Sequence, residues 1–210
     1  MPPPVIAANN FQELQPRDGV RALLFDWDGT LADSQQINFR VLSDALAQQG
    51  LPMSYEWLAA RTGVSTAEMV SQVGLLHSRS VNAQAIANAR DQAFLERASE
   101  VRLVPHVELL LQQQRGKRVI ALATGGAKDT VYAVINSLGI ADLFDVIVTR
   151  EDVENGKPSP DIFLLASERL GVKPKDCLVY EDSDEGLQAS LTAGMAAIDV
   201  RPIRRTMLDY

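Results

Sequence analysis

Short apolar runs alternate with helical patterns along most of the chain. Five runs have the length and composition of buried strands: residues 21–25, 119–123, 146–148, 177–180 and a weaker one at 196–200. A stretch with apolar residues at helical spacing precedes each of the last four runs, and a glycine stands near its end, at Gly116, Gly139, Gly171 and Gly194. Strand and helix therefore alternate from residue 103 onward. This alternation predicts crossover connections and a parallel α/β sheet.

The region between the first and second runs has a different pattern. Residues 36–101 contain no convincing strand and carry helical spacing throughout, first around 37–46 and then in shorter pieces. A helical block that interrupts an α/β pattern indicates an inserted second domain. We therefore expect three parts: a loose, proline-rich leader at 1–20, an α/β core at 21–35 and 102–210, and a helical insertion at 36–101.

Composition and charge narrow the class of protein. The 210 residues are 46% hydrophobic, and 20 basic against 27 acidic side chains give a net charge of −7, which is typical of a globular protein. The acidic balance argues against nucleic acid or an anionic membrane as the main partner. The single cysteine, Cys177, cannot form an internal disulfide. With no signal-like start and no long apolar run, we expect a cytoplasmic protein.

Polar clusters follow four of the runs, where an open parallel sheet binds ligands. Asp26 and Asp28 follow the first run and precede Gly29. One such carboxylate can act as a nucleophile while the other moves protons. A solvated acidic turn or a calcium-type loop would explain the same residues, so this cluster alone leaves the chemistry open. Asp33 or Ser34 is expected to cap the next helix.

The second and third clusters could bind an anion. Thr124 and Gly125, at the start of a predicted helix, would let backbone N–H groups approach a phosphate, although an ordinary glycine-rich turn capped by threonine fits equally well. Lys157 lies in a loop stiffened by Pro158 and Pro160. A lysine in a loop is usually exposed to solvent, so this motif too is open in isolation.

The fourth cluster adds negative charge. Glu181 and Asp182 follow the fourth run and would face Asp26 and Asp28 across the end of the sheet. These carboxylates would repel one another without a cation, and oxygen ligands of this kind suit Mg²⁺. The next two acids, Asp184 and Glu185, fit the first turn of the following helix instead.

With four clusters in this order, the chain resembles the haloacid dehalogenase superfamily of phosphatases. Residues 26–34 resemble its first motif, Asp-x-Asp-Gly-Thr, and the insertion resembles a small helical cap. Residues 156–161 and 181–183 resemble the third and fourth motifs of the β-phosphoglucomutase-like and sugar-phosphate phosphatase branch. The resemblance covers residues 21–200. It implies a Rossmann-like parallel sheet with an inserted helical cap.

The resemblance also implies a reaction and its residues. The expected activity is Mg²⁺-dependent hydrolysis of a small phosphorylated metabolite, such as a sugar phosphate, through an aspartyl-phosphate. By position in the motifs, Asp26 would be the nucleophile and Asp28 the acid and base. The phosphate would be bound by Thr124, Gly125 and Lys157. The metal ligands would be Asp26, the backbone carbonyl of Asp28, and Asp182, with Glu181 either a ligand or an outer partner.

Several positions depart from the family pattern. Asn38 stands where the mutases and many phosphatases keep a histidine, and Thr66 stands where the mutases carry a phosphate-binding arginine. Gly125 and Gly126 occupy a place where many members have a polar side chain. Gly63 and Ser65 resemble the substrate loop of the cap, although a plain turn explains them equally well, and with Asn38 they are the candidate cap-side contacts. Residues expected to be structural are His77, His106, Trp27 and Trp57.

Alternative functions differ from hydrolysis in identifiable ways. A phosphomutase would use the same nucleophile but needs a second phosphate site. A dehalogenase of the same fold needs neither the metal nor an acid at position 28. A phospho-acceptor signalling or binding module of the receiver type is shorter and lacks a helical insertion. The sequence favours the hydrolase, and leaves the metabolite and the oligomeric state undetermined.

Overall fold

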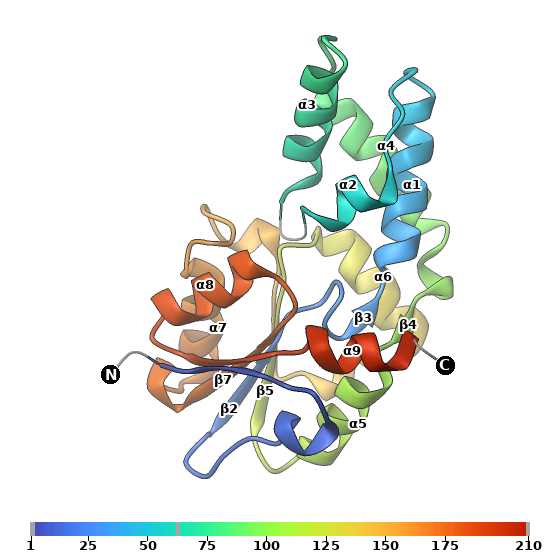
Figure 1. Cartoon of the computed structure of the whole chain (residues 1–210). Coiled ribbons are helices and arrows are strands. Elements are labelled where there is room, and N and C mark those ends of the chain that lie inside the picture. Colours follow the sequence, from blue (N-terminus) through green and yellow to red (C-terminus); the bar gives the residue numbers. More distant parts are fainter. Residues whose placement is uncertain (1–2, 62–63, 209–210) are drawn as a thin grey trace.

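One parallel sheet forms the centre of the molecule. The computed structural model describes residues 3–61 and 64–208 (Figure 1). Its six strands lie in the order β1-β8-β7-β2-β5-β6, and every neighbouring pair is parallel. The strands are β1 (Val5–Ala7), β2 (Ala22–Phe25), β5 (Val119–Ala123), β6 (Val146–Val148), β7 (Cys177–Glu181) and β8 (Ala196–Asp199). The predicted Rossmann-like α/β sheet is confirmed.

Helices cover both faces of this sheet. Alternate residues of each strand point to opposite faces, and since both sets are apolar, each face is buried by helices. Leu23 and Phe25 pack with residues of α5 and α6, while Ala22 and Leu24 pack with residues of α7 and α8. The helices around the sheet are α5 (Pro105–Gln114), α6 (Lys128–Leu138), α7 (Asp161–Leu170), α8 (Asp184–Thr192) and α9 (Arg201–Leu208). Short 3₁₀ turns are η1 (Phe11–Leu14), η2 (Ala98–Glu100), η3 (Ala141–Leu143), η4 (Arg150–Asp152) and η5 (Pro174–Asp176). None of the helices in the described ranges is long and apolar enough to cross a membrane.

A second group of helices projects away from the sheet, at the top of Figure 1. These are α1 (Gln35–Ala47), α2 (Tyr55–Ala59), α3 (Thr66–Leu76) and α4 (Ala83–Leu95). They share a small apolar core of their own, formed by Leu42, Ala45, Leu46, Leu51, Val70, Val73 and Ile86. The chain leaves and re-enters the main body through an antiparallel pair of two-residue strands, β3 (Ala32–Asp33) and β4 (Arg102–Leu103). This pair was not predicted.

The described part of the proline-rich leader is not loose. Val5–Ala7 adds an edge strand beside β8, and Ala8 and Leu14 are completely buried. Tyr180, in the middle of the sheet, donates a hydrogen bond from its hydroxyl to the Leu14 carbonyl at 2.8 Å. The expectation of a loose segment at 1–20 is therefore wrong for residues 5–14, because a three-residue strand gives no recognisable pattern in the sequence.

Candidate active site

Lys157 joins two buried carboxylates at the carboxyl end of the sheet. Its Nζ lies 2.5 Å from Asp26 Oδ1 and 2.5 Å from Glu181 Oε1, and all three side chains are almost inaccessible to solvent. Asp26 follows β2 and Glu181 ends β7, which are neighbours in the sheet. The loop before α7 brings Lys157 to them, and the lysine is buried rather than exposed. The ion pairs hold one carboxylate oxygen of Asp26 in a fixed direction.

Burial and mutual repulsion perturb the ionisation of this group. Burial, together with the charge of Glu181, raises the pKa of Asp26 well above its usual range, although Lys157 opposes the shift. The pKa of Asp182 is also raised, first by burial and then by Glu181, against the effect of Arg204. Burial lowers the pKa of Lys157, but the charges of Asp26 and Glu181 outweigh it and raise that pKa above its ordinary value. The lysine therefore stays protonated, while ionisation of Asp26 and Asp182 is disfavoured because one ammonium does not offset burial and the repulsion from Glu181.

Three of these carboxylates can hold a metal ion. One oxygen each from Asp26, Glu181 and Asp182 lies within 4.8 Å of the others. Two glycines allow this approach: a Cβ at Gly29 would lie 2.1 Å from Asp182 Oδ2, and one at Gly186 would lie 1.8 Å from Glu181 Oε1. Three buried carboxylates beside a single ammonium are oxygen donors that fit a hard divalent cation such as Mg²⁺.

Asp28 lies next to this cluster but is held by different partners. Its Oδ1 accepts hydrogen bonds from Ser34 Oγ and, at 3.0 Å, from Asn38 Nδ2. The side-chain amide oxygen of Asn38, Oδ1, in turn accepts a hydrogen bond from Nη2 of Arg90, a residue of α4. Ser34 occupies the N-cap position of α1 without a side-chain capping bond, so the expected capping role is wrong. Its hydroxyl instead donates to Asp28 and accepts from Asn38 Nδ2 at 3.2 Å.

The turn after β5, residues 124–127, lines the same cavity as Asp26 and Asp28. Thr124 is buried, and its Oγ1 accepts from the Gly126 N–H at 2.9 Å, which closes the turn before α6. A Cβ at Gly125 would meet nothing within 4 Å, whereas one at Gly126 would lie 3.0 Å from Val131 and 3.4 Å from Asp28 Oδ2. A side chain would therefore be more crowded at Gly126 than at Gly125, and the sequence alone did not distinguish the two.

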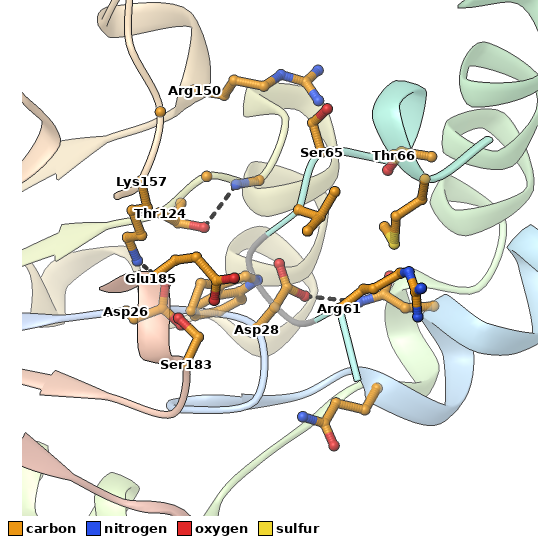
Figure 2. Close-up of a pocket in the computed structure, with 18 of the residues that line it drawn as sticks. Asp26, Asp28, Arg61, Ser65, Thr66, Thr124, Arg150, Lys157, Ser183 and Glu185 are labelled. Atoms are coloured by element: carbon orange, nitrogen blue, oxygen red, sulfur yellow. Dashed lines mark hydrogen bonds and ion pairs between the residues drawn. The ribbon is translucent and has the colours of Figure 1, made fainter. Parts of the chain in front are cut away.

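A cavity of about 1020 Å³ connects these groups to the helices above them. Figure 2 shows Asp26, Lys157 and Thr124 grouped on one side, with Ser65 and Thr66 across from them. Ser65 lines the cavity and also caps α3, because its Oγ accepts from the Glu68 N–H at 3.3 Å. Gly63, the other predicted residue of this loop, lies outside the described residues.

The predicted site residues are thus mostly brought together. Asp26, Asp28, Asn38, Ser65, Thr124, Gly125, Lys157 and Asp182 all line the cavity, while Glu181 lies behind Lys157. The Asp28 carboxylate is not part of the acidic cluster of the described residues and is bonded to Ser34 and Asn38 instead. Sequence reasoning missed Arg61, Arg90 and Arg204, which also line the cavity.

The residues expected to be structural are accounted for. Trp27 is buried in the main core. Trp57 packs against the core of the α1–α4 helices, and the Arg61 guanidinium carbon lies 3.8 Å from the centre of its ring. His77 Nε2 lies 3.1 Å from the Pro52 carbonyl oxygen, and the His106 ring contacts that of Phe11.

Comparisons with known proteins agree with this arrangement. A family model described as haloacid dehalogenase-like hydrolase matches residues 23–200. The fructose-1-phosphate phosphatase YqaB of Escherichia coli (strain K12) is 32% identical over 180 residues, 85% of this chain and 95% of that protein. The β-phosphoglucomutase of Bacillus subtilis is 28% identical over 188 residues, 86% of this chain and 83% of that protein.

A solved structure shows the same architecture. The crystal structure of CbbY from Rhodobacter sphaeroides in complex with phosphate superimposes with a TM-score of 0.76, at 27% identity, over 86% of each chain. The resemblance inferred from the four clusters is confirmed. By its matched family model, its relatives and its fold, the chain belongs to the haloacid dehalogenase-like hydrolases, as an enzyme of the phosphatase type.

Proposed function

We propose that the protein is a Mg²⁺-dependent hydrolase of small phosphomonoesters, with sugar phosphates as substrates, acting through an aspartyl-phosphate. The observation that carries the proposal is the buried Asp26–Lys157–Glu181 bridge beside an independently held carboxylate, Asp28. One acid is fixed for attack and the other for proton transfer, which is the division of labour that nucleophilic phosphoryl transfer requires. Relatives such as YqaB, a fructose-1-phosphate phosphatase, support the substrate class.

Asp26 is proposed as the nucleophile. Lys157 donates to its Oδ1, so the carboxylate cannot rotate freely and an attacking oxygen is directed into the cavity. The ammonium also opposes the rise that burial and Glu181 cause in the pKa of Asp26, and it offers positive charge to the phosphate as the new P–O bond forms. Glu181 fixes Lys157 from the other side, and is itself bound by the Ser183 N–H and hydroxyl.

Asp28 is proposed to protonate the leaving oxygen and then to take a proton from the attacking water. Ser34 and Asn38 both donate to Oδ1, which leaves Oδ2 directed toward the turn that contains Gly126. The phosphate would lie between these residues, held by the Thr124 hydroxyl, the Gly125 N–H and Lys157. This position places the acid and the nucleophile on the same phosphoryl group, as the reaction demands.

The metal would be held by Asp26 and Asp182, by the Asp28 carbonyl and, directly or as an outer partner, by Glu181. When bound, Mg²⁺ would neutralise charge on the transferred phosphoryl group. Among the chain's own residues, Thr30 and Gln35 donate to the two oxygens of Asp182, at 3.3 Å and 3.2 Å, and orient this carboxylate.

Residues 36–101 are proposed to act as a cap over the site. The cavity lies between these helices and the sheet, and Ser65 and Asn38 reach it from the cap. A cap excludes bulk water and limits the substrate to a small metabolite. The remaining segments, 21–35 and 102–210, would form the catalytic core, and β1 (Val5–Ala7) of the predicted leader lies at the edge of its sheet. The cytoplasmic location remains a prediction.

A phosphomutase is the second candidate, and one residue favours it. Arg61 lines the cavity, lies over the Trp57 ring at 3.8 Å and makes no ion pair with any described residue. Its Nε and Nη1 donate to Gln72 Oε1 at 3.0 Å and to the Trp57 backbone carbonyl at 2.9 Å, so a second phosphate would bind through Nη2. The hydrolase is favoured because Thr66, which also lines the cavity, stands where the mutases carry a phosphate-binding arginine. It offers a single hydroxyl in place of a guanidinium.

Product analysis separates the two reactions. The protein is incubated with Mg²⁺ and β-glucose 1-phosphate, with and without a trace of glucose 1,6-bisphosphate, and with fructose 1-phosphate, and products are followed by ³¹P NMR. We expect inorganic phosphate, no requirement for the bisphosphate, and no turnover by Asp26→Asn, which folds normally. Glucose 6-phosphate formed faster than inorganic phosphate would support the mutase and overturn the hydrolase.

A further inference from the structure

The C-terminal helix places an arginine against the acidic cluster. Arg204, in α9, donates from Nη1 to the Gly29 carbonyl oxygen and lies 3.4 Å from Asp182 Oδ2 through the same nitrogen. Its Nη2 lies 3.2 Å from Asp33 Oδ1. The Arg204 side chain is only 16% exposed, and the Asp182 side chain is 3% exposed, so this is a buried contact rather than a surface pair.

These contacts join segments that lie far apart in the sequence. Gly29 is in the turn after the nucleophile strand, Asp182 follows β7, and Arg204 lies outside residues 23–200, the range that the family model matches. Gly29 and Asp182 meet so closely that a Cβ at position 29 would lie 2.1 Å from Asp182 Oδ2. The guanidinium spans this junction, with one nitrogen shared by the turn and the carboxylate.

A planar guanidinium can hold several oxygens in one fixed geometry, which an ammonium cannot do. Arg204 and Gln35 both contact Oδ2 of Asp182, while Thr30 contacts Oδ1. Partners of this kind fix the direction of a metal-binding carboxylate, and their loss typically lowers metal affinity by about 10–100-fold.

We propose that Arg204 is a positioning residue for the metal site: α9 extends back over the nucleophile turn and fixes the direction of Asp182 for a divalent cation. This inference rests on the proposed function, because it takes the acidic cluster to be the Mg²⁺ site. It assigns to the segment after residue 200 a role in the chemistry.

The test is the affinity of the folded protein for Mg²⁺, measured by isothermal titration calorimetry after removal of metal with EDTA. The wild type is compared with Arg204→Gln and Arg204→Lys. The matched control is Arg201→Gln, on the same helix, whose side chain pairs with Asp199 at 2.8 Å and Asp184 at 2.7 Å instead of Asp182. Melting temperatures show whether each variant keeps its fold and its helix in place.

We expect Arg204→Gln to weaken Mg²⁺ binding at least tenfold, and Arg204→Lys to recover little of the loss. Arg201→Gln should stay within twofold of the wild-type dissociation constant, even if it lowers the melting temperature as much. Equal or tighter Mg²⁺ binding by a folded Arg204→Gln variant, or full recovery by lysine, would overturn the inference. If the wild type itself binds no Mg²⁺, the proposed function is contradicted instead.

Discussion

Glycine at position 186 is a requirement of the site rather than of the helix that contains it. It lies in the first turn of α8, where alanine is ordinarily favoured over glycine by about 1 kcal/mol. Here a Cβ would lie 1.8 Å from Glu181 Oε1 and 2.0 Å from its Cδ, so the glutamate could not keep its place. Because Glu181 fixes Lys157, the effect would extend to Asp26.

We therefore expect Gly186→Ala to reverse the usual helix preference. Overpacking of this kind costs about 1–3 kcal/mol, and the displaced Glu181 should lower kcat/KM at least tenfold. Urea denaturation and phosphatase assays measure the two effects. The control is Gln188→Ala on the exposed face of the same helix, which should change stability by no more than about 0.5 kcal/mol and leave activity intact. A Gly186→Ala protein as stable and as active as the wild type would contradict this account.

At the scale of elements, a chain of hydrogen bonds runs from the cap to the proposed acid. Arg90 on α4 donates to Asn38 on α1, and Asn38 donates to Asp28 at 3.0 Å. The arginine pairs with Asp91 at 2.7 Å and lies 5.0 Å from the centre of the Phe94 ring, so its own position is well defined. Because Arg90 binds the side-chain oxygen Oδ1 of Asn38, the NH₂ group of the same side-chain amide faces Asp28.

Removal of the guanidinium should therefore reduce turnover without unfolding the cap. We expect Arg90→Met to lower kcat about tenfold, because Asp28 loses a directed partner and spends less time in the reactive position. The measurement is steady-state hydrolysis of p-nitrophenyl phosphate, with the melting temperature as a check on folding. Arg40→Met is the control, since Arg40 is exposed on α1 and its ion pair among the described residues is a 3.8 Å contact with the exposed Glu100. An unchanged kcat in Arg90→Met would show that Asn38 orients Asp28 unaided.

The sequence predicts some of these elements and contacts but not others, for physical reasons. Asp26 and Glu181 could be placed together because each follows a buried apolar run, and parallel strands end at one edge of a sheet. The three-residue β1 and the two-residue β3 and β4 are too short to show a period. Arg204 contacts a carbonyl 175 residues away and Arg90 contacts an amide 52 residues away, so no local pattern marks either.

For the whole molecule, the consequence is that the candidate active site includes contacts from parts of the chain that lie far from the motifs. The central sheet aligns Asp26, Glu181 and Asp182. The cap holds Asp28 through Asn38, and α9 reaches the acidic cluster through Arg204. The edge strand β1 and Leu14 complete the core on the side of Tyr180. Segments far apart in the sequence therefore meet at the carboxyl end of the strands.

The central claim is that Asp26 forms a covalent phosphoryl intermediate. The most direct measurement mixes the protein with Mg²⁺ and excess fructose 1-phosphate or p-nitrophenyl phosphate, quenches with acid within milliseconds, reduces acyl phosphates with borohydride, and maps the modified residue by peptide mass spectrometry. We predict conversion of Asp26 to homoserine, with no such product in Asp26→Asn. Rapid phosphate release without modification of Asp26, or modification at another residue, would contradict the account.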